Sequence, residues 1–154
     1  EVRRRMPDAM LWIVGEGDDE ARLRSLASDR GVGGAVRFHG RVSDAELGDL
    51  YQRASVFAMP SRREGFGLVY AEAMWHGLPC IGSTLDAAGQ VIVDGETGCL
   101  VPYADPRATG DAVASLLANP VRARAFGEAG RRRAREHFGY ERFRRDLLAA
   151  LDLA

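Results

Sequence analysis

Short apolar runs alternate with segments of helical periodicity over the first two thirds of the chain. Runs of about five apolar residues closed by Gly or Pro, such as MLWIVG, are typical of buried strands. Between them, apolar residues recur three or four positions apart, as expected for amphipathic helices. The predicted strands cover 10–15, 35–40, 55–60, 78–83 and 98–102, and the predicted helices cover 18–31, 43–54 and part of 61–77.

This alternation predicts the fold class. Parallel neighbours need crossover connections, and both faces of a parallel sheet must be covered, so we expect a doubly wound, Rossmann-like α/β fold. After Pro102 the alternation stops, and the pattern predicts C-terminal helices over 105–117, 121–137 and 140–153. No linker interrupts the pattern, so residues 1–154 are interpreted as a single domain.

Two local signals add detail. Ser43 with Glu46 three residues later is a capping box that starts a helix. The segment VDGETG at 93–98 predicts a turn.

Composition narrows the functional classes. Of the 154 residues, 21 are basic, all of them Arg, and 22 are acidic, so the formal charge of −1 does not favour nucleic acid as a partner. Cys80 and Cys99 lack the spacing of a zinc site or disulfide framework, which predicts free thiols in a reducing cytoplasm. No apolar run is long enough to cross a bilayer, and the start EVRRRMPDA resembles the end of a helix rather than a signal peptide.

The candidate chemistry lies in SRREGFGLVYAEAMWHG at 61–77, where a strand gives way to a helix. Ligands of open α/β folds bind outside the carboxyl ends of the strands, where helix N-termini present unpaired amides. Gly65 and Gly67 would let the backbone approach a phosphate, and the amides of Phe66, Gly67 and Leu68 would be donors. The segment therefore predicts a diphosphate site.

Two acids flank this site. Glu72 would lie about 9 Å further along the helix, which is roughly the offset from a diphosphate to its ribose hydroxyls. Glu64 would face the group on the other side of the phosphates. The spacing alone is weak, because Glu128 and Glu136 repeat it on an Arg-rich helix. A helix-dipole acid with an unrelated surface acid is the alternative interpretation.

The segment MPSRREGFGLVYAEAMWHGLPCIGS resembles the E-x7-E region of retaining GT-B glycosyltransferases. MPDAMLWIVGEG, AVRFHGRVSDAEL, YQRASVFAMPS and VDGETGCLVP resemble, in order, the successive strands of that family's C-terminal nucleotide-sugar domain. GEAGRRRAREHFGYERF resembles its closing helices. The similarity covers essentially the whole chain, and it implies the C-terminal half of a GT-B fold.

The resemblance implies a role for each matching residue. Glu64 would contact the donor sugar and stabilise charge during transfer, and Glu72 would bind the ribose diol. No metal or other cofactor is implied. The remaining implied donor contacts are the Gly65, Phe66, Gly67 and Leu68 turn, the loop Gly40, Arg41 and Val42 beside the base, and Gly15 and Gly17 lining the crevice.

The sequence also departs from the family pattern. The Arg and Lys that clamp the diphosphate would precede Glu1, and the N-terminal acceptor domain is absent, so we expect a truncated donor domain that is inactive alone. The absent first strand would lie between 11–14 and 56–59, leaving two unpaired edges, and homodimer packing is one way to cover them. The loop at 83–89 differs from the commoner paired-glycine loop.

The expected function is sugar transfer from a UDP-, GDP- or ADP-sugar to an unidentified acceptor hydroxyl. The alternatives are a non-catalytic nucleotide-binding module and another sugar-nucleotide enzyme such as an epimerase. A dehydrogenase is disfavoured, because GEGDDE lacks the third glycine of GxGxxG. The run RRRAR at 131–135 is either a contact with anionic lipid at the inner membrane face or a solvated helix face.

Overall fold

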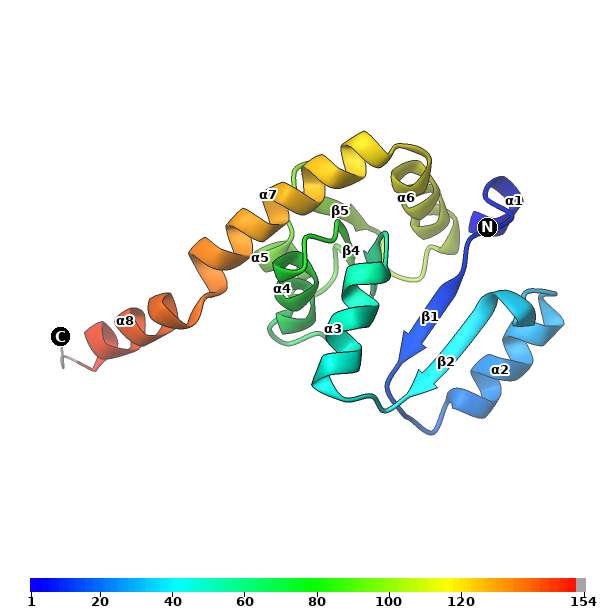
Figure 1. Ribbon diagram of the computed structural model, residues 1–154, viewed down its shortest axis with the longest axis horizontal. Helices are drawn as coiled ribbons and strands as arrows, with labels where there is room; N and C mark the ends of the chain where they lie inside the picture. The colour runs from blue at the N-terminus through cyan, green and yellow to red at the C-terminus, as the bar shows by residue number, and fades with distance from the viewer. Residues whose placement is uncertain (152–154) are drawn as a thin grey trace. The chain divides into compact units, whose positions relative to one another are not determined.

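The computed structural model describes residues 1–151, in which strands and helices alternate as the sequence pattern predicts (Figure 1). The described chain divides into two units, the first ending at Leu50 and the second beginning at Tyr51. The first unit holds α1 (Val2–Arg5), β1 (Leu11–Val14), α2 (Glu20–Asp29), the 3-10 helix η1 (Gly33–Ala35) and β2 (Val36–Gly40), and α3 (Asp44–Arg53) crosses the boundary. The second unit holds β3 (Phe57–Ala58), α4 (Leu68–Trp75), β4 (Cys80–Ser83), α5 (Ala88–Val91), β5 (Gly98–Val101), α6 (Pro106–Ala118), α7 (Pro120–Phe138) and α8 (Tyr140–Ala150).

In the first unit, β1 and β2 pair in parallel, with Leu11 opposite Val36. The register shifts between Ile13 and Val14, at the end of β1. α2 runs beside β2 (Figure 1), and the guanidinium carbon of Arg24 lies 4.3 Å from the centre of the Phe38 ring. The connection between two parallel strands thus forms a helix that packs on their sheet.

In the second unit, the parallel strands follow the order β3-β4-β5. All four residues of the central strand β4 are buried, as the continuous apolar run at 78–83 predicts. β3 has only two residues, although the sequence predicts a strand over 55–60. Pro60 has no amide to donate, and the pairing of this segment ends with the Met59 amide, which donates to the Ile81 carbonyl at 3.0 Å.

The parallel α/β class is confirmed, with the strands divided between two sheets. Within residues 1–151, β1 pairs only with β2, and β3 is the end strand of its sheet. Leu11 and Val14 are exposed on β1. Both strands are therefore sheet edges among the described residues. The further strand that the sequence analysis expects beside them stays a prediction.

The core of the second unit lies between α4, the sheet and α7. Tyr70 and Met74 on α4 are fully buried. α7 runs alongside α4 (Figure 1) and approaches it so closely that a Cβ atom at Gly127 would lie 2.0 Å from the Gly77 carbonyl oxygen. A side chain at position 127 would therefore separate the two helices.

Two arginines of α7 cap neighbouring helices. The Arg131 Nη2 group donates to the carbonyl of His76, the residue after α4, at 2.7 Å. Arg133 donates to two carbonyls at the end of α5, those of Gln90 at 2.9 Å and Val91 at 2.7 Å. Helix C-termini leave carbonyls without partners inside the helix, and these guanidinium groups satisfy them.

Both local sequence signals are confirmed. The Ser43 hydroxyl accepts from the Glu46 amide at 3.3 Å, which closes the capping box. The Glu46 carboxylate accepts from the Ser43 amide at 2.8 Å and from the Ser43 hydroxyl at 2.7 Å, and these two bonds lower the pKa of Glu46. In the turn at 93–98, the Gly95 amide donates to the Gly98 carbonyl at 2.9 Å. η1 and α5 were not predicted, because helices of three and four residues are too short to show periodicity.

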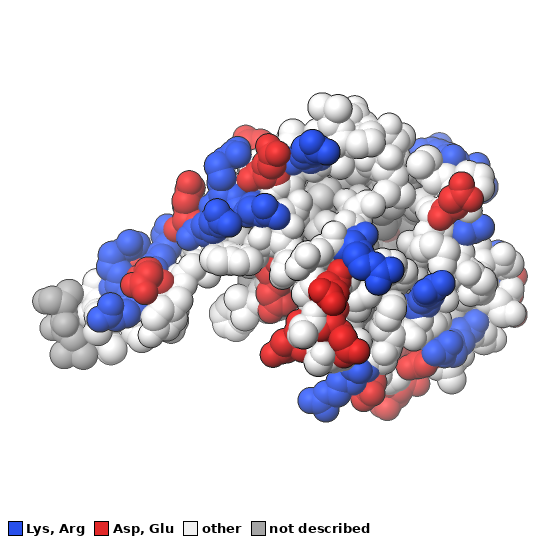
Figure 2. Space-filling view, in the orientation of Figure 1, with Lys and Arg blue, Asp and Glu red and all other residues white. Residues whose placement is uncertain are grey.

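The ends of α6 and α7 and the start of α8 match their predicted positions within one residue. α8 ends at Ala150 with Leu151 as its C-cap, earlier than predicted, and positions 152 and 153 of its predicted range lie outside the described residues. Arginines and acids are interspersed over α7 and α8 (Figure 2). No helix within residues 1–151 is long and apolar enough to span a membrane.

Candidate functional site

The loop between β3 and α4 is held in place by three hydrogen bonds. The Tyr70 hydroxyl donates to the Met59 carbonyl at 2.5 Å, which ties α4 to the end of β3. The Ser61 hydroxyl donates to the Asp86 carboxylate beyond β4. The Ala87 amide donates to the Glu64 carbonyl at 3.3 Å. The segment with the candidate residues is therefore preorganised at the carboxyl edge of the sheet.

The Asp86 carboxylate also organises the next helix. Its second oxygen accepts from the Ala88 amide at 2.9 Å, at the start of α5. Nearby, burial together with the charges of Asp86 and Glu64 raises the pKa of Tyr70 well above its ordinary value. Tyr70 is therefore a neutral phenol that can donate its hydrogen bond to the loop.

The turn before α4 uses one of its predicted donors internally. The Gly67 amide donates to the Glu64 carboxylate at 3.1 Å, which corrects the expectation that it is unpaired. The amides of Phe66 and Leu68 make no hydrogen bond to the described residues. Phe66 is 80% exposed. Two of the three predicted amides thus remain available, and the third holds Glu64 beside the helix start.

Gly67 is required by the local structure as well as by any ligand. Its φ of 71° is left-handed, and a Cβ atom there would lie 2.9 Å from Val91 Cγ2 and 3.2 Å from Tyr70 Cδ2. Gly65 has nothing within 4 Å of its Cβ position. The open space around Gly65 fits the predicted approach of a ligand to the backbone.

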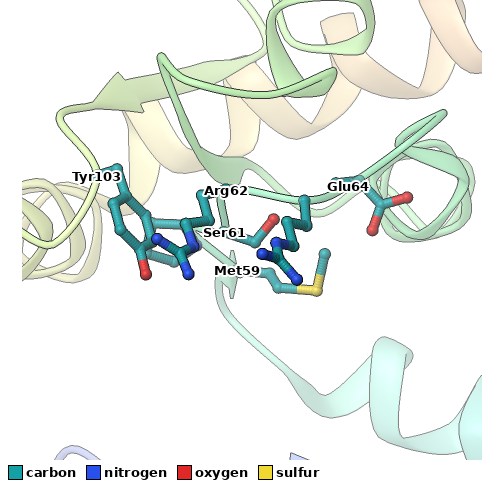
Figure 3. Close-up of a pocket in the computed structure, with 7 residues that line it drawn as sticks. Met59, Ser61, Arg62, Glu64 and Tyr103 are labelled. Atoms are coloured by element: carbon teal, nitrogen blue, oxygen red, sulfur yellow. The ribbon is translucent and has the colours of Figure 1, made fainter.

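An open pocket of about 470 Å³ lies at the carboxyl edge of this sheet (Figure 3). Its wall runs from Met59 to Glu64 and is completed by Tyr103, which follows β5. In Figure 3, Arg62 lies beside Tyr103, while Glu64 is at the other end of the pocket. The guanidinium carbon of Arg62 lies 5.9 Å from the centre of the Tyr103 ring.

Glu72 is exposed on α4 and does not line this pocket. Its carboxylate accepts from the Tyr51 hydroxyl at 3.4 Å. Burial, followed by the charge of Glu72, raises the pKa of Tyr51 to about 12. The Tyr51 ring also stacks on His76, with the ring centres 5.0 Å apart. Glu64 precedes α4 and lines the pocket, whereas Glu72 lies on α4 beside Tyr51. The two glutamates therefore have different neighbours.

The remaining candidate residues lie in the first unit. The Gly15 amide donates to the Gly40 carbonyl at 2.8 Å, so the loops after β1 and β2 meet. Gly40 has a left-handed φ of 63°, and the Arg41 amide donates to the Glu16 carboxylate at 3.4 Å. The predicted base-site residues Gly40, Arg41 and Val42 therefore share one loop cluster with Gly15 and with Gly17, two residues further along the chain.

Sequence reasoning missed four residues of these clusters: Glu16, Tyr51, Asp86 and Tyr103. Each contacts a candidate segment from a distant part of the chain, so no local spacing reveals it. Glu16 has a partial signal, because it stands between two glycines after a strand. No group of three or more potential metal ligands from His, Cys, Asp and Glu occurs in the described part of the chain.

The family model described as "Glycosyl transferases group 1" matches residues 1–133. A GDP-mannose-dependent alpha-(1-6)-phosphatidylinositol monomannoside mannosyltransferase from Mycolicibacterium smegmatis is 42% identical over 138 residues, covering 85% of this chain and 36% of its own length. The chain thus spans about a third of the length of that curated relative.

Solved structures also match this chain. Sucrose-phosphate synthase from Thermosynechococcus elongatus matches 97% of this chain and 41% of its own, with 32% identity and a TM-score of 0.84. HepE from Anabaena, solved in complex with UDP, shares the fold at a TM-score of 0.87 and 17% identity, over 99% of this chain and 44% of its own. The chain belongs to the Glycosyl transferases group 1 family.

Proposed function

We propose that this chain is the donor-binding domain of a longer, retaining glycosyltransferase, which moves a sugar from a nucleotide-diphosphate sugar to an acceptor hydroxyl. The observation that carries the proposal is the preorganised turn, where Glu64 stands beside the free amides of Phe66 and Leu68 at the carboxyl edge of the sheet. Family membership supports the reaction class.

In this proposal the start of α4 holds the diphosphate. Free amides and the positive end of the helix dipole favour an anion there, and the open space at Gly65 admits it close to the backbone. As the diphosphate leaves, the same groups stabilise its growing charge. The proposed route needs no metal, so chelation with EDTA should leave transfer unchanged.

Glu64 is the proposed catalytic residue. The Ala87 amide holds its backbone and the Gly67 amide holds its carboxylate, so the charge is fixed before substrate binds. A fixed carboxylate beside the reacting sugar can stabilise positive charge that develops at the anomeric carbon during transfer. Glu64→Gln keeps the shape and removes that charge.

Glu72 is the proposed partner of the ribose diol. Its carboxylate is exposed and, among the residues that the structure describes, accepts one long hydrogen bond, from the Tyr51 hydroxyl at 3.4 Å, so it retains capacity to accept from two hydroxyls. The nucleobase is assigned to the loop of Gly40, Arg41 and Val42, with Gly15 and Gly17 nearby. A GDP-sugar is the first donor to test, because the 42% identical relative is named as GDP-mannose-dependent.

The name of the same relative supports a proposal for cellular placement. Its name specifies a phosphatidylinositol-linked acceptor, so we place the parent enzyme in the cytoplasm with a peripheral contact at the inner membrane face. The structure narrows which residues of the run at 131–135 could serve that contact. Arg131 and Arg133 cap α4 and α5, and Arg135 lies 5.8 Å from the Trp75 ring. The run is therefore a weaker lipid-binding candidate than its sequence indicates.

The test is calorimetric titration of this chain with GDP, UDP and ADP, alone and as their sugar conjugates. Glu72→Ala should weaken binding about tenfold or more, because charge-assisted hydrogen bonds each contribute about 1.5–3 kcal/mol. Glu128→Ala and Glu136→Ala are matched controls, since they repeat the same spacing on α7 and should bind as the wild type does.

Glu64→Gln should bind the nucleotide normally in this chain and lose transfer in the longer protein. The assay there must separate sugar transfer with retained configuration from isomer formation, which an epimerase would show. Absence of binding to every nucleotide tested would favour a non-catalytic module and refute the proposal.

A further inference from the structure

The pocket of Figure 3 carries more positive than negative charge. Arg62 and Arg63 both line it, both are exposed, and no carboxylate of the described residues forms an ion pair with either. Glu64 is the one acid in the wall, and its carboxylate accepts from the Gly67 amide. Two guanidinium groups thus face one carboxylate that already has a partner.

Arg62 is held where an anion can reach it. The Tyr103 ring supports its guanidinium through a cation–π contact at 5.9 Å, and Tyr103 is itself 40% exposed. A guanidinium that lies over a ring at this distance keeps its N–H groups free to donate to an anion. Its planar fork matches the oxygens of a phosphate.

The pocket also has space for more than a bare anion. A volume of about 470 Å³ lies within the range of small-molecule sites, and Met59, Pro60 and Tyr103 give it an apolar surface. An apolar wall beside two cations suits a ligand with an uncharged ring and an ionic substituent. A phosphorylated sugar or polyol has this chemistry.

We propose that this pocket binds the phosphate ester of the second substrate, a phosphorylated sugar or polyol, through Arg62 and Arg63, with Tyr103 beside its ring. The inference rests on the proposed function, in which Glu64 stands at the reacting sugar and the donor diphosphate occupies the start of α4. Arg62 and Tyr103 lie at the end of the pocket opposite Glu64 (Figure 3), so their phosphate is distinct from the diphosphate.

The experiment titrates this chain with glucose 6-phosphate, glucose and inorganic phosphate, following the backbone amide resonances of Arg62 and Tyr103 by NMR. Glucose 6-phosphate should shift both and bind more tightly than inorganic phosphate, while glucose alone should cause no shift. Arg62→Gln and Arg63→Gln should each weaken binding about tenfold. Arg124→Gln removes an exposed arginine of α7 and should change nothing.

A second titration in saturating GDP identifies the source of the phosphate. Unchanged affinity for glucose 6-phosphate supports a separate acceptor subsite, whereas competitive loss means that the anion occupies the donor diphosphate site and overturns the inference. Equal binding by Arg62→Gln, Arg63→Gln and the wild type also overturns it.

Failure of the inference and of the proposed function can be told apart. If GDP or UDP binds and glucose 6-phosphate does not, only the acceptor subsite is wrong. If no nucleotide binds, the donor-domain proposal fails first and the subsite falls with it.

Discussion

Replacing Gly67 by Ala tests whether the turn before α4 is built as the structure describes. A left-handed φ costs an L residue about 1–2 kcal/mol, and Gly67 has a φ of 71°. The added Cβ would also lie 2.9 Å from Val91 Cγ2 and 3.2 Å from Tyr70 Cδ2, in a core that cannot open freely. Overpacking of this kind costs about 1–3 kcal/mol.

The two effects together predict that Gly67→Ala lowers the free energy of unfolding by about 2–5 kcal/mol. With a urea m-value of about 2 kcal/mol per M, the unfolding midpoint should fall by about 1–2.5 M. Circular dichroism in urea measures the shift. Gly65→Ala is the matched control, because nothing lies within 4 Å of its Cβ and its φ is not left-handed, so its midpoint should barely move.

A double-mutant cycle separates the two causes. Val91→Ala removes the nearer contact, so Gly67→Ala should cost less in that background, and the remaining cost should come from the backbone conformation and the contact with Tyr70. Gly67→Ala and Gly65→Ala with the same midpoint would refute the reasoning. That result would mean that the turn is not left-handed or that it does not pack against α5.

Three further outcomes follow from other parts of the second unit. The Tyr51 phenol should titrate with a pKa of about 12, which phenolate absorbance measures. The stability that its burial as a neutral phenol contributes is fully present below about pH 10 and is lost as the pH rises through 12. Glu72→Gln should lower the pKa of Tyr51, because it removes a neighbouring negative charge. Asp105→Ala removes the N-cap whose carboxylate accepts from the Ala108 amide at 2.8 Å, and it should cost about 1 kcal/mol in urea unfolding. Cys80 is fully buried, and burial raises the pKa of its thiol, so mass spectrometry after iodoacetamide treatment should find it unmodified until the chain is unfolded.

The elements that sequence predicts well are those with a strong local pattern. The run at 78–83 contains β4, whose residues are all buried, and the predicted capping box of Ser43 and Glu46 is present in the structure. Sequence predicts an element less well where contacts with distant strands determine its length. β3 shortens to two residues because its pairing with β4 stops before Pro60, and the extent of that pairing depends on a distant strand that the local pattern does not contain.

The residues of the candidate site likewise fall into those that a local pattern identifies and those that only tertiary contacts reveal. Glu64 and the glycines around it could be identified from one uninterrupted segment. Asp86 and Tyr103 could not, because tertiary folding alone brings them to that segment; Asp86 bonds to Ser61 across 25 positions of sequence. The hydrogen bond from the Gly67 amide to the Glu64 carboxylate was also missed, because the sequence alone is equally consistent with Glu64 pointing toward a ligand.

The two capping arginines of α7 fix the position of that helix along its own axis relative to α4 and α5. Arg131 and Arg133 are two residues apart, yet one terminates α4 and the other α5. Inserting or deleting one residue in α7 ahead of them would rotate both away from their carbonyls at once. The C-terminal region should therefore tolerate exchange of its outward side chains far better than any change in its length.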